Sequence, residues 1–400
     1  MRAAAPDTLR EVVEALAPLE RRAGSDGELQ AARWLAQRLE RAGAEVQIEE
    51  EQFHDGYARV IGTLTAAGAL AGVAALRPRT RRAAGLAAAL ITSAIADDVS
   101  NGPRVFRRAT TPLRPTWNVI ARCGDPDATR TLVLLAHHDA APTGAIFDDQ
   151  TQAFLGELFP GVLERIDTSV PFWWLTLGMP AMIAIGAARR TRAPIRVGIL
   201  GSLVSTAVLA DIARRPVSPG ANDNLSAVAV LVALAEQLRD NPVQELRVML
   251  VSCGAEEVLQ GGIHGFAARH FPSLDRDRTW FLNLDTVGSP KLVLVEGEGP
   301  VVMEDYHDRT FRDLVVRAGE RADVHMRRGM RSRASTDAVV PSRAGYPTAT
   351  ITSIDRYKML SNYHKMSDTP ENVDYRTVMQ ALILTDALAR ELGRNPWLGR

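Results

Sequence analysis

Several histidines and carboxylates follow directly after apolar, strand-like segments of the chain, or lie in the adjoining loops. In an α/β protein, ligands bind beyond the carboxyl ends of the strands, so side chains at these positions are expected to converge. Imidazole and carboxylate groups together suit zinc, cobalt or manganese, and such a site needs no cysteine. The pattern therefore predicts a metal centre, and its candidate residues are His137, Asp139, Asp223, Glu256, Glu257, Asp285 and His364.

Asp223 lies in a polar loop, residues 218–226, that runs into an apolar helical segment from 225 to 238. A carboxylate at such a position can simply cap the helix. Alternatively, it can bind through both of its oxygens and be shared by two metal ions about 3.5–4 Å apart. We interpret Asp223 as the candidate bridging ligand, because its loop contains the turn residues Pro219 and Gly220 and is the most constrained of the set.

Glu256 and Glu257 are adjacent, and neighbouring side chains cannot both point in one direction. We therefore expect the two residues to have different roles. One can bind metal while the other accepts a proton from a metal-activated water. Asp139 stands two residues after His137 on the same strand face and can hold the second imidazole nitrogen. Each residue alone has a structural alternative, such as a helix cap or a solvated acidic pair. Their coincidence at successive strand ends favours a two-metal hydrolase site.

The candidate residues fall within five motifs: His137-His138-Asp139, GANDNLS at 220–226, Glu256-Glu257 with Gly261-Gly262, Asn283-Leu284-Asp285, and YHKMSDTP at 363–370. This ordered set resembles the zinc aminopeptidases of family M28. The resemblance implies two zinc ions, with His137 and Asp285 on one, Glu257 and His364 on the other, and Asp223 shared. It further implies that Glu256 is the general base, that Asp139 orients an imidazole, and that the Asp223–Asn224 peptide bond is cis.

Other residues near these motifs have simpler interpretations. We expect His138 to pack against the site or support it rather than bind metal, and Asp368 to brace the loop of His364. His264 and His270 are expected to lie at the surface or at the end of a helix. The basic segment 327–333 predicts a solvated loop. The alternative is that its arginines bind a carboxylate of the substrate.

Short apolar segments alternate with amphipathic helical segments along most of the chain. This alternation predicts an α/β fold with a mainly parallel mixed sheet covered by helices on both faces. The resemblance to family M28 implies the zinc-exopeptidase version of that fold. The predicted strands are 45–49, 117–121, 131–136, 246–251, 280–284, 291–295 and 349–352, and the main helices are two within 8–44, then 225–238, 308–322 and 375–392.

Two pairs of apolar segments interrupt the α/β pattern and echo one another. Residues 60–76 and 83–96 flank the basic stretch 77–82, and residues 170–188 and 197–210 flank a second basic stretch. Each pair predicts an apolar helical hairpin with a basic tip. The first leg of each hairpin approaches the roughly 18–20 residues that cross a bilayer, and Trp173 and Trp174 suit a membrane interface. Buried hairpins in a soluble protein are the alternative.

The hairpins divide the predicted catalytic domain into three parts. Its segments are 1–58, 99–168 and 214–400, and the hairpin insertions are 59–98 and 169–213. We expect a membrane-associated, multi-pass protein that contacts the bilayer through residues 60–96 and 170–210. The positive-inside rule would put the basic tips in the cytoplasm and the catalytic domain outside. The N-terminus lacks the apolar core of a cleavable signal peptide, which disfavours a secreted soluble enzyme and leaves the side of the catalytic domain open.

Composition limits the remaining function classes. Lys plus Arg and Asp plus Glu each number 47, so the formal net charge is zero and gives no bias toward nucleic acid. Two cysteines, Cys123 and Cys253, cannot build a disulfide framework. We expect a zinc-dependent aminopeptidase acting on peptides or aminoacyl amides. The alternatives are a glutaminyl-cyclase-like acyltransferase, which uses one zinc ion, and a non-catalytic membrane receptor or scaffold.

Overall fold

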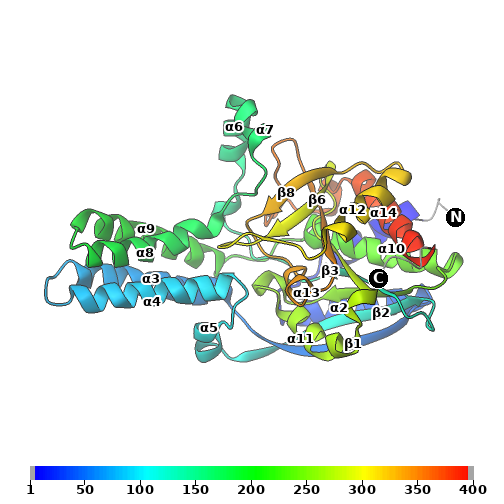
Figure 1. Ribbon diagram of the computed structural model, residues 1–400, viewed down its shortest axis with the longest axis horizontal. Coiled ribbons are helices and arrows are strands. Elements are labelled where there is room, and N and C mark those ends of the chain that lie inside the picture. The colour runs from blue at the N-terminus through cyan, green and yellow to red at the C-terminus, as the bar shows by residue number, and fades with distance from the viewer. Residues whose placement is uncertain (1–4, 395–400) are drawn as a thin grey trace.

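A single mixed sheet of nine strands organises the protein (Figure 1), and the computed structural model describes residues 5–394. The strand order is β1-β2-β4-β3-β5-β9-β6-β7, with β8 paired to β6. The four central strands β4, β3, β5 and β9 are mutually parallel, and antiparallel pairs lie on both sides of them. The strands are β1(Glu45–His54), β2(Leu113–Gly124), β3(Thr131–His137), β4(Arg247–Cys253), β5(Thr279–Leu284), β6(Lys291–Glu298), β7(Glu304–Asp305), β8(Arg327–Ser332) and β9(Thr348–Ile354).

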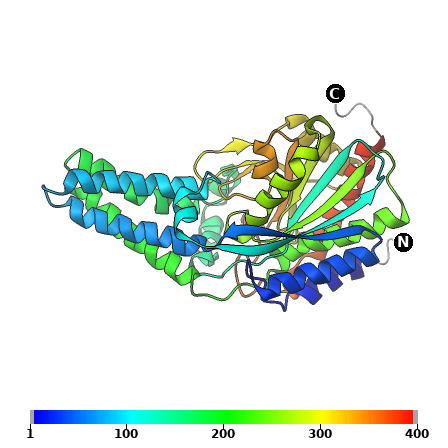
Figure 2. The same ribbon diagram turned by 90° about the horizontal axis from the view of Figure 1, so that it is seen from below.

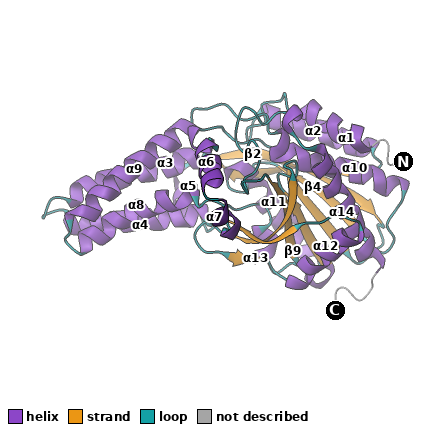
Figure 3. Ribbon diagram, turned by 90° about the horizontal axis from the view of Figure 1, so that it is seen from above, coloured by secondary structure: helices purple, strands orange, loops and turns teal. Residues whose placement is uncertain are grey.

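Helices cover both faces of this sheet, and Figure 3 shows the strands enclosed between them. Alternate residues of β3 enter two different cores: Leu132 and Leu134 pack with the helices of one face, whereas Val133 and Leu135 pack with α11 on the other. Every residue of β3 is therefore buried, as expected of a strand covered on both sides. The covering helices are α1(Ala5–Leu16), α2(Asp26–Arg41), α10(Ser226–Asp240), α12(Arg309–Arg321) and α14(Tyr375–Arg394) on one face, and α11(Gly261–His270) and α13(Val339–Arg343) on the other. The predicted fold class is confirmed.

The two apolar hairpins pack together as one four-helix bundle that projects away from the sheet (Figures 1 and 2). Its helices are α3(Tyr57–Ala75), α4(Arg81–Val99), α8(Phe172–Ala188) and α9(Arg192–Ile212). Small residues allow this close packing, since a Cβ on Gly72 would lie 2.4 Å from Ile199 and one on Gly198 would lie 2.5 Å from Ile183. The association joins segments that are far apart in the sequence.

Several segments differ from the expectations drawn from the sequence. The basic segment 327–333 is not a solvated loop: most of it forms strand β8, in which Arg328 pairs with Glu296 and Arg331 with Asp305. Helix α9 is longer than its uncharged run, because the helix begins at Arg192 and continues through Arg196. Four short helices among the described residues also lie outside the predicted set, namely α5(Val105–Thr110), α6(Gln150–Leu158), α7(Pro160–Arg165) and α13.

Candidate metal centre

The predicted site residues converge at one edge of the sheet. His137 is the last residue of β3, Asp285 directly follows β5, and Glu256 and Glu257 lie in a single helical turn after β4. These three strands are parallel neighbours, so their carboxyl ends meet. His364 comes from the loop after β9, which is the next parallel strand, and Asp223 lies in the loop before α10. The strand-end rule therefore explains the convergence.

The carboxylate of Asp223 lies between two histidines. Its Oδ1 is 3.3 Å from Nε2 of His137, and its Oδ2 is 3.4 Å from Nε2 of His364. Nε2 of His364 also lies 3.3 Å from Oε2 of Glu257. Among the described residues, possible ligand atoms form three groups, each with all its atoms within 4.8 Å of one another. The groups are His137, Asp223 and Asp285; Asp223, Glu257 and His364; and His137, Glu256 and Glu257. The first two groups have Asp223 in common, which is the arrangement that a shared carboxylate ligand requires.

Buried polar atoms that make no hydrogen bond indicate that this cluster fits metal ions. Among the described residues, Oδ2 of Asp223, Oε1 of Glu257 and both ring nitrogens of His364 have no hydrogen-bond partner. Buried side-chain polar atoms are nearly always hydrogen-bonded, so such a group of exceptions calls for an explanation. Two imidazoles and three carboxylates form a donor set that zinc accepts. The residues present therefore fit zinc.

Charge crowding supports the same interpretation. Burial raises the pKa of Glu257 to about 7, although contact with His364 acts in the opposite direction. Burial also raises the pKa of Glu256 well above its usual range, and the neighbouring Asp337 and Glu257 add to the effect. Burial alone would lower the pKa of His364, but Glu257 and Asp223 raise it to about 10. A cation beside these carboxylates would favour their ionised forms.

Asp139 connects the histidine strand to the glutamate pair. Its two carboxylate oxygens accept hydrogen bonds from the backbone N–H groups of Glu256 and Glu257, both at 3.0 Å. Its Oδ1 also lies 3.4 Å from Nδ1 of His137, and its carbonyl oxygen lies 3.2 Å from the same nitrogen. Asp139 is thus next to the imidazole, as predicted, and it also fixes the turn that carries the glutamates.

The loop that carries Asp223 is held from two sides. The carboxylate of Asp368 accepts hydrogen bonds from the backbone N–H groups of Asn222 at 2.8 Å and Asp223 at 3.1 Å. The buried guanidinium of Arg21 donates to the carbonyl oxygens of Pro219 and Gly220 at 2.8 and 3.2 Å. Asp368 therefore braces this loop, whereas we expected it to brace the loop of His364. The Asp223–Asn224 peptide bond is cis, as the family resemblance implies.

The remaining histidines near the motifs lie outside the three ligand groups. His138 is fully buried, and its Nδ1 lies 3.0 Å from Oγ of Ser252. Nε2 of His264 lies 3.1 Å from the side chain of Asn101. His270 contacts the carboxylate of Glu49. These positions agree with the supporting and peripheral roles expected for them.

Sequence reasoning missed several polar residues that surround the candidate base. Nε2 of Gln260 donates to Oε1 of Glu256 at 3.0 Å, and the only sequence signal was its position four residues after Glu256. The ring of Tyr363 stacks on His364 with 3.8 Å between centroids. By contrast, the segment Ser335-Thr336-Asp337 resembles a loop that lines the cleft in family M28, so its presence here was expected from the sequence. Asp337 is buried at the site, and burial raises its pKa to about 7.

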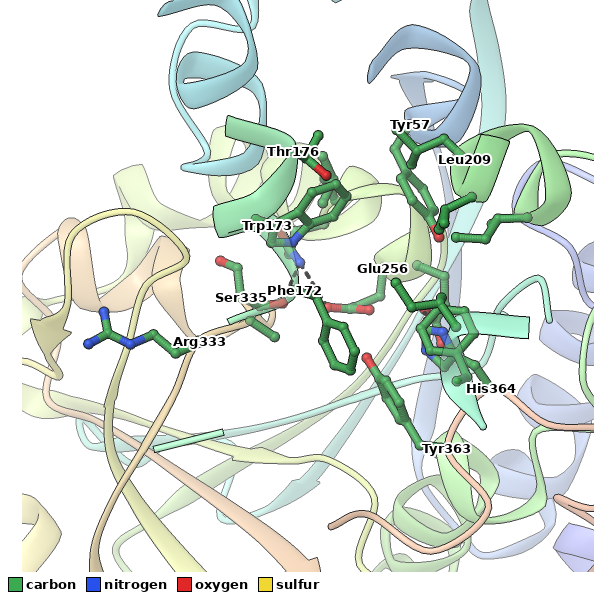
Figure 4. A pocket seen from close by; sticks show the side chains of 18 residues that line it. Tyr57, Phe172, Trp173, Thr176, Leu209, Glu256, Arg333, Ser335, Tyr363 and His364 are labelled. Carbon is green, nitrogen blue, oxygen red and sulfur yellow. Dashed lines mark hydrogen bonds and ion pairs between the residues drawn. The ribbon is translucent and has the colours of Figure 1, made fainter. Parts of the chain in front are cut away.

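A cavity of about 130 Å³ opens onto the candidate metal centre (Figure 4). Glu256, Glu257 and His364 form part of its lining, and the hydroxyl of Tyr363 points into it. The opposite wall comes from the ends of α3, α8 and α9, where these helices meet the sheet domain. The bundle and the metal centre therefore share one cavity.

Comparison with known proteins gives a family match over part of the chain and a fold for nearly all of it. The model of peptidase family M28 matches residues 206–386. The glutaminyl cyclase of Bacteroides thetaiotaomicron, solved with N-acetylhistamine, is 13% identical with a TM-score of 0.57, covering 96% of this chain and 97% of its own. The aminopeptidase from Aneurinibacillus sp. strain AM-1 is 15% identical with a TM-score of 0.57, covering 98% and 95%. BSAP, a zinc aminopeptidase from Bacillus subtilis, is 15% identical with a TM-score of 0.55, covering 97% and 94%.

The comparison with curated proteins finds no match. At 13–15% identity the solved structures establish the fold, and the family model adds the sequence relationship over the segment that contains Asp223, Glu256, Glu257, Asp285 and His364. The resemblance drawn from the motifs is thereby confirmed: the chain has the zinc-exopeptidase fold, and residues 206–386 match the model of peptidase family M28.

Proposed function

We propose that the protein is a metal-dependent aminopeptidase that hydrolyses the N-terminal amide bond of peptides or aminoacyl amides. The observation that carries the proposal is the position of Asp223, whose two oxygens face His137 and His364 from within two overlapping ligand groups. His137 and Asp285 would hold one zinc ion, and Glu257 and His364 the other. Zinc bound there would act as a Lewis acid toward the scissile carbonyl and make a water molecule more acidic.

Glu256 is the proposed general base. Its Oε2 lies 3.9 Å from Nε2 of His137, beside the two groups that share Asp223, while Oε1 is held by Gln260. From this position it would accept a proton from the attacking water and return it to the departing amine. Asp139 would keep Glu256 in place through the backbone of the turn and would orient the His137 imidazole.

Substitution of Glu256 by Gln tests this assignment. The amide keeps the size of the side chain but cannot accept the proton, so kcat should fall by about 10²–10⁴-fold. Zinc content, measured by elemental analysis, should stay the same because Glu256 is not a proposed ligand. Glu257→Gln is the matched variant at the next position, and it should lose metal. A Glu256→Gln enzyme that hydrolyses leucinamide at the wild-type rate would refute the role.

A glutaminyl-cyclase-like acyltransferase is the second candidate, because the cyclase of B. thetaiotaomicron matches this chain over 96% of its length. Such an enzyme would cyclise N-terminal glutamine and would need one zinc ion rather than two. Assays of glutaminyl and leucyl amides on the same preparation, with a zinc count per chain, separate the two reactions. A chain that binds no zinc and processes neither substrate would support a non-catalytic receptor or scaffold.

We also propose that the four-helix bundle enters a membrane. Helices α3 and α9 are long and apolar enough to cross a bilayer, and α8 is apolar but shorter. Leu70, Leu86, Leu90 and Leu200 are each more than 60% exposed on the bundle surface, where lipid would cover them. The loops at the far ends carry the arginines of 77–82 and 189–192, which suit lipid headgroups.

Extraction from membranes tests this placement. A spanning bundle should remain in the membrane pellet after washing with high salt and with alkaline carbonate, and should be released by detergent. Release by carbonate alone would refute spanning. Cysteine labelling of a residue in the 77–82 loop from either side would then determine the orientation, which we expect to be cytoplasmic for both tips.

A further inference from the structure

The cavity over the metal centre is built partly from the two hairpin insertions. Tyr57 is the first residue of α3, Trp173 and Thr176 lie in the first two turns of α8, and Leu209 lies in the last turn of α9. All of them line the cavity opposite Glu256 and His364 (Figure 4). Two segments inserted at separate points of the chain therefore meet directly above the candidate catalytic residues.

Aromatic contacts fix this wall in position. The ring of Tyr57 meets the ring of Trp173 edge-on with 6.0 Å between centroids, which joins the first hairpin to the second. Phe147 links the wall to the site, since its ring lies 6.2 Å from Phe172 and 4.5 Å from His364. Such edge-on aromatic pairs are favourable beyond the area they bury. These contacts therefore hold the helix ends that line the cavity in a fixed position relative to His364.

The size and chemistry of the cavity indicate what it would accept. Apolar cavities of roughly 150 Å³ admit a molecule the size of benzene, so a cavity of about 130 Å³ has room for one branched aliphatic side chain. The hairpin residues named above contribute aromatic and aliphatic groups and two hydroxyls to it. On the opposite side, the carboxylates of Glu256 and Glu257 would repel an acidic group. Among the described residues, the one guanidinium in the lining, that of Arg333, lies over the ring of Trp174. An apolar group is the best fit.

We propose that the ends of the two hairpins form the specificity wall of the active site, and that Trp173, Thr176 and Leu209 set the size of the apolar side chain accepted at the substrate N-terminus. The proposal rests on the aminopeptidase function proposed above. It gives the bundle a second role, because the helices that would anchor the protein also select its substrate.

Size-changing variants test the wall. Thr176→Phe should fill the cavity and lower the ratio of kcat/KM for leucinamide to that for alaninamide by about tenfold or more. Trp173→Ala should enlarge the cavity and raise the ratio for tryptophanamide over leucinamide. Leu200→Phe is the matched control, since Leu200 lies on α9 with 66% of its surface exposed outside the cavity, and both ratios should stay at wild-type values. Ratios measured on one preparation cancel losses of folded enzyme.

Product binding supplies a readout that does not depend on turnover. Titration calorimetry in detergent should show that free L-leucine binds the wild type and the Leu200→Phe variant equally and binds Thr176→Phe at least about tenfold more weakly. Unchanged substrate ratios and unchanged leucine affinity in both cavity variants would overturn the proposal while leaving the aminopeptidase function intact. A zinc-loaded wild type that hydrolyses no aminoacyl amide and binds no free amino acid would instead refute the aminopeptidase and the wall together.

Discussion

Arg21 offers the sharpest test of how the candidate site is held together. It is fully buried, and burial lowers the pKa of its guanidinium to about 10. The group donates to the carbonyl oxygens of Leu16 at 2.7 Å, His138 at 2.8 Å and Pro219 at 2.8 Å. One side chain thereby connects the end of α1, the residue after the proposed ligand His137, and the loop that leads to Asp223.

The cost of removing this group follows from its three short bonds. Each carbonyl that loses its donor while buried costs about 1–3 kcal/mol. Relaxation and entry of water reduce the sum, so we expect Arg21→Met to lower the free energy of unfolding by about 3–5 kcal/mol, the range found when one partner of a buried charged network is removed. Arg21→Lys should recover part of this loss, because an ammonium keeps the charge but cannot reproduce the planar fork of a guanidinium.

Denaturant unfolding of the purified chain in detergent measures the effect, with and without zinc. The neighbouring Arg22→Met variant is the control, because Arg22 donates a single exposed hydrogen bond to the carbonyl of Arg215. We expect that variant to change stability by no more than about 0.5 kcal/mol. The Arg21→Met variant should also bind zinc more weakly, since the loop of Asp223 loses its support. A change for Arg21→Met as small as that for Arg22→Met would show that the network does not hold the site.

Three further predictions concern the surroundings of the site. Burial raises the pKa of Glu298 to about 8, so between pH 5 and 8 the folded chain keeps a proton that the unfolded chain releases. The free energy of unfolding should therefore fall by up to about 1.4 kcal/mol per pH unit over this range. Chemical denaturation should show that the free energy of unfolding of Glu298→Gln depends less on pH. Asp98 and Arg107 form a buried ion pair at 2.8 Å. Asp98→Asn should lower the free energy of unfolding by about 3–5 kcal/mol, and thermal unfolding measures the change. An unchanged melting temperature would contradict the importance of the pair. The hydroxyl of Tyr363 points into the cavity, where it can contact the transition state. Tyr363→Phe should therefore lower kcat for leucinamide more than it raises KM. A change in KM alone would show that the hydroxyl acts only in substrate binding.

The strand-end rule explains why much of the site could be predicted from sequence. His137, Glu257 and Asp285 lie at or beyond the ends of mainly apolar segments. Such segments become central parallel strands because both of their faces must be covered. Once these strands are parallel neighbours, the residues after them have to meet. The prediction needed only local sequence patterns and one general property of α/β sheets.

Side-chain contacts between residues far apart in the sequence could not be predicted in the same way. Nothing in the sequence around Arg21 indicates that its guanidinium reaches the loop before Asp223, and Gln260 shows its role only when the turn after β4 is folded. Strand β8 was not predicted for a different reason. Its arginine-rich sequence is typical of a solvated loop, and the partners of these arginines, Glu296 and Asp305, are known only from the folded structure. Charge pairs of this kind depend on tertiary structure.

The hairpins illustrate the same limit, and their contacts with the sheet domain bear on the proposal that the bundle forms part of the active site. Their apolar legs and basic tips were visible in the sequence, but their association with one another and with the cavity was not. The ion pair of Asp98 and Arg107 lies where α4 meets the sheet domain, and Arg107 also donates to the carbonyl of Val258 at 3.2 Å. Val258 closes the helical turn that begins at Glu256, so the end of the hairpin contacts the segment that carries the proposed base. A chain with short loops in place of the hairpins would keep the ligands at the strand ends, but it would lose both the cavity wall and this support.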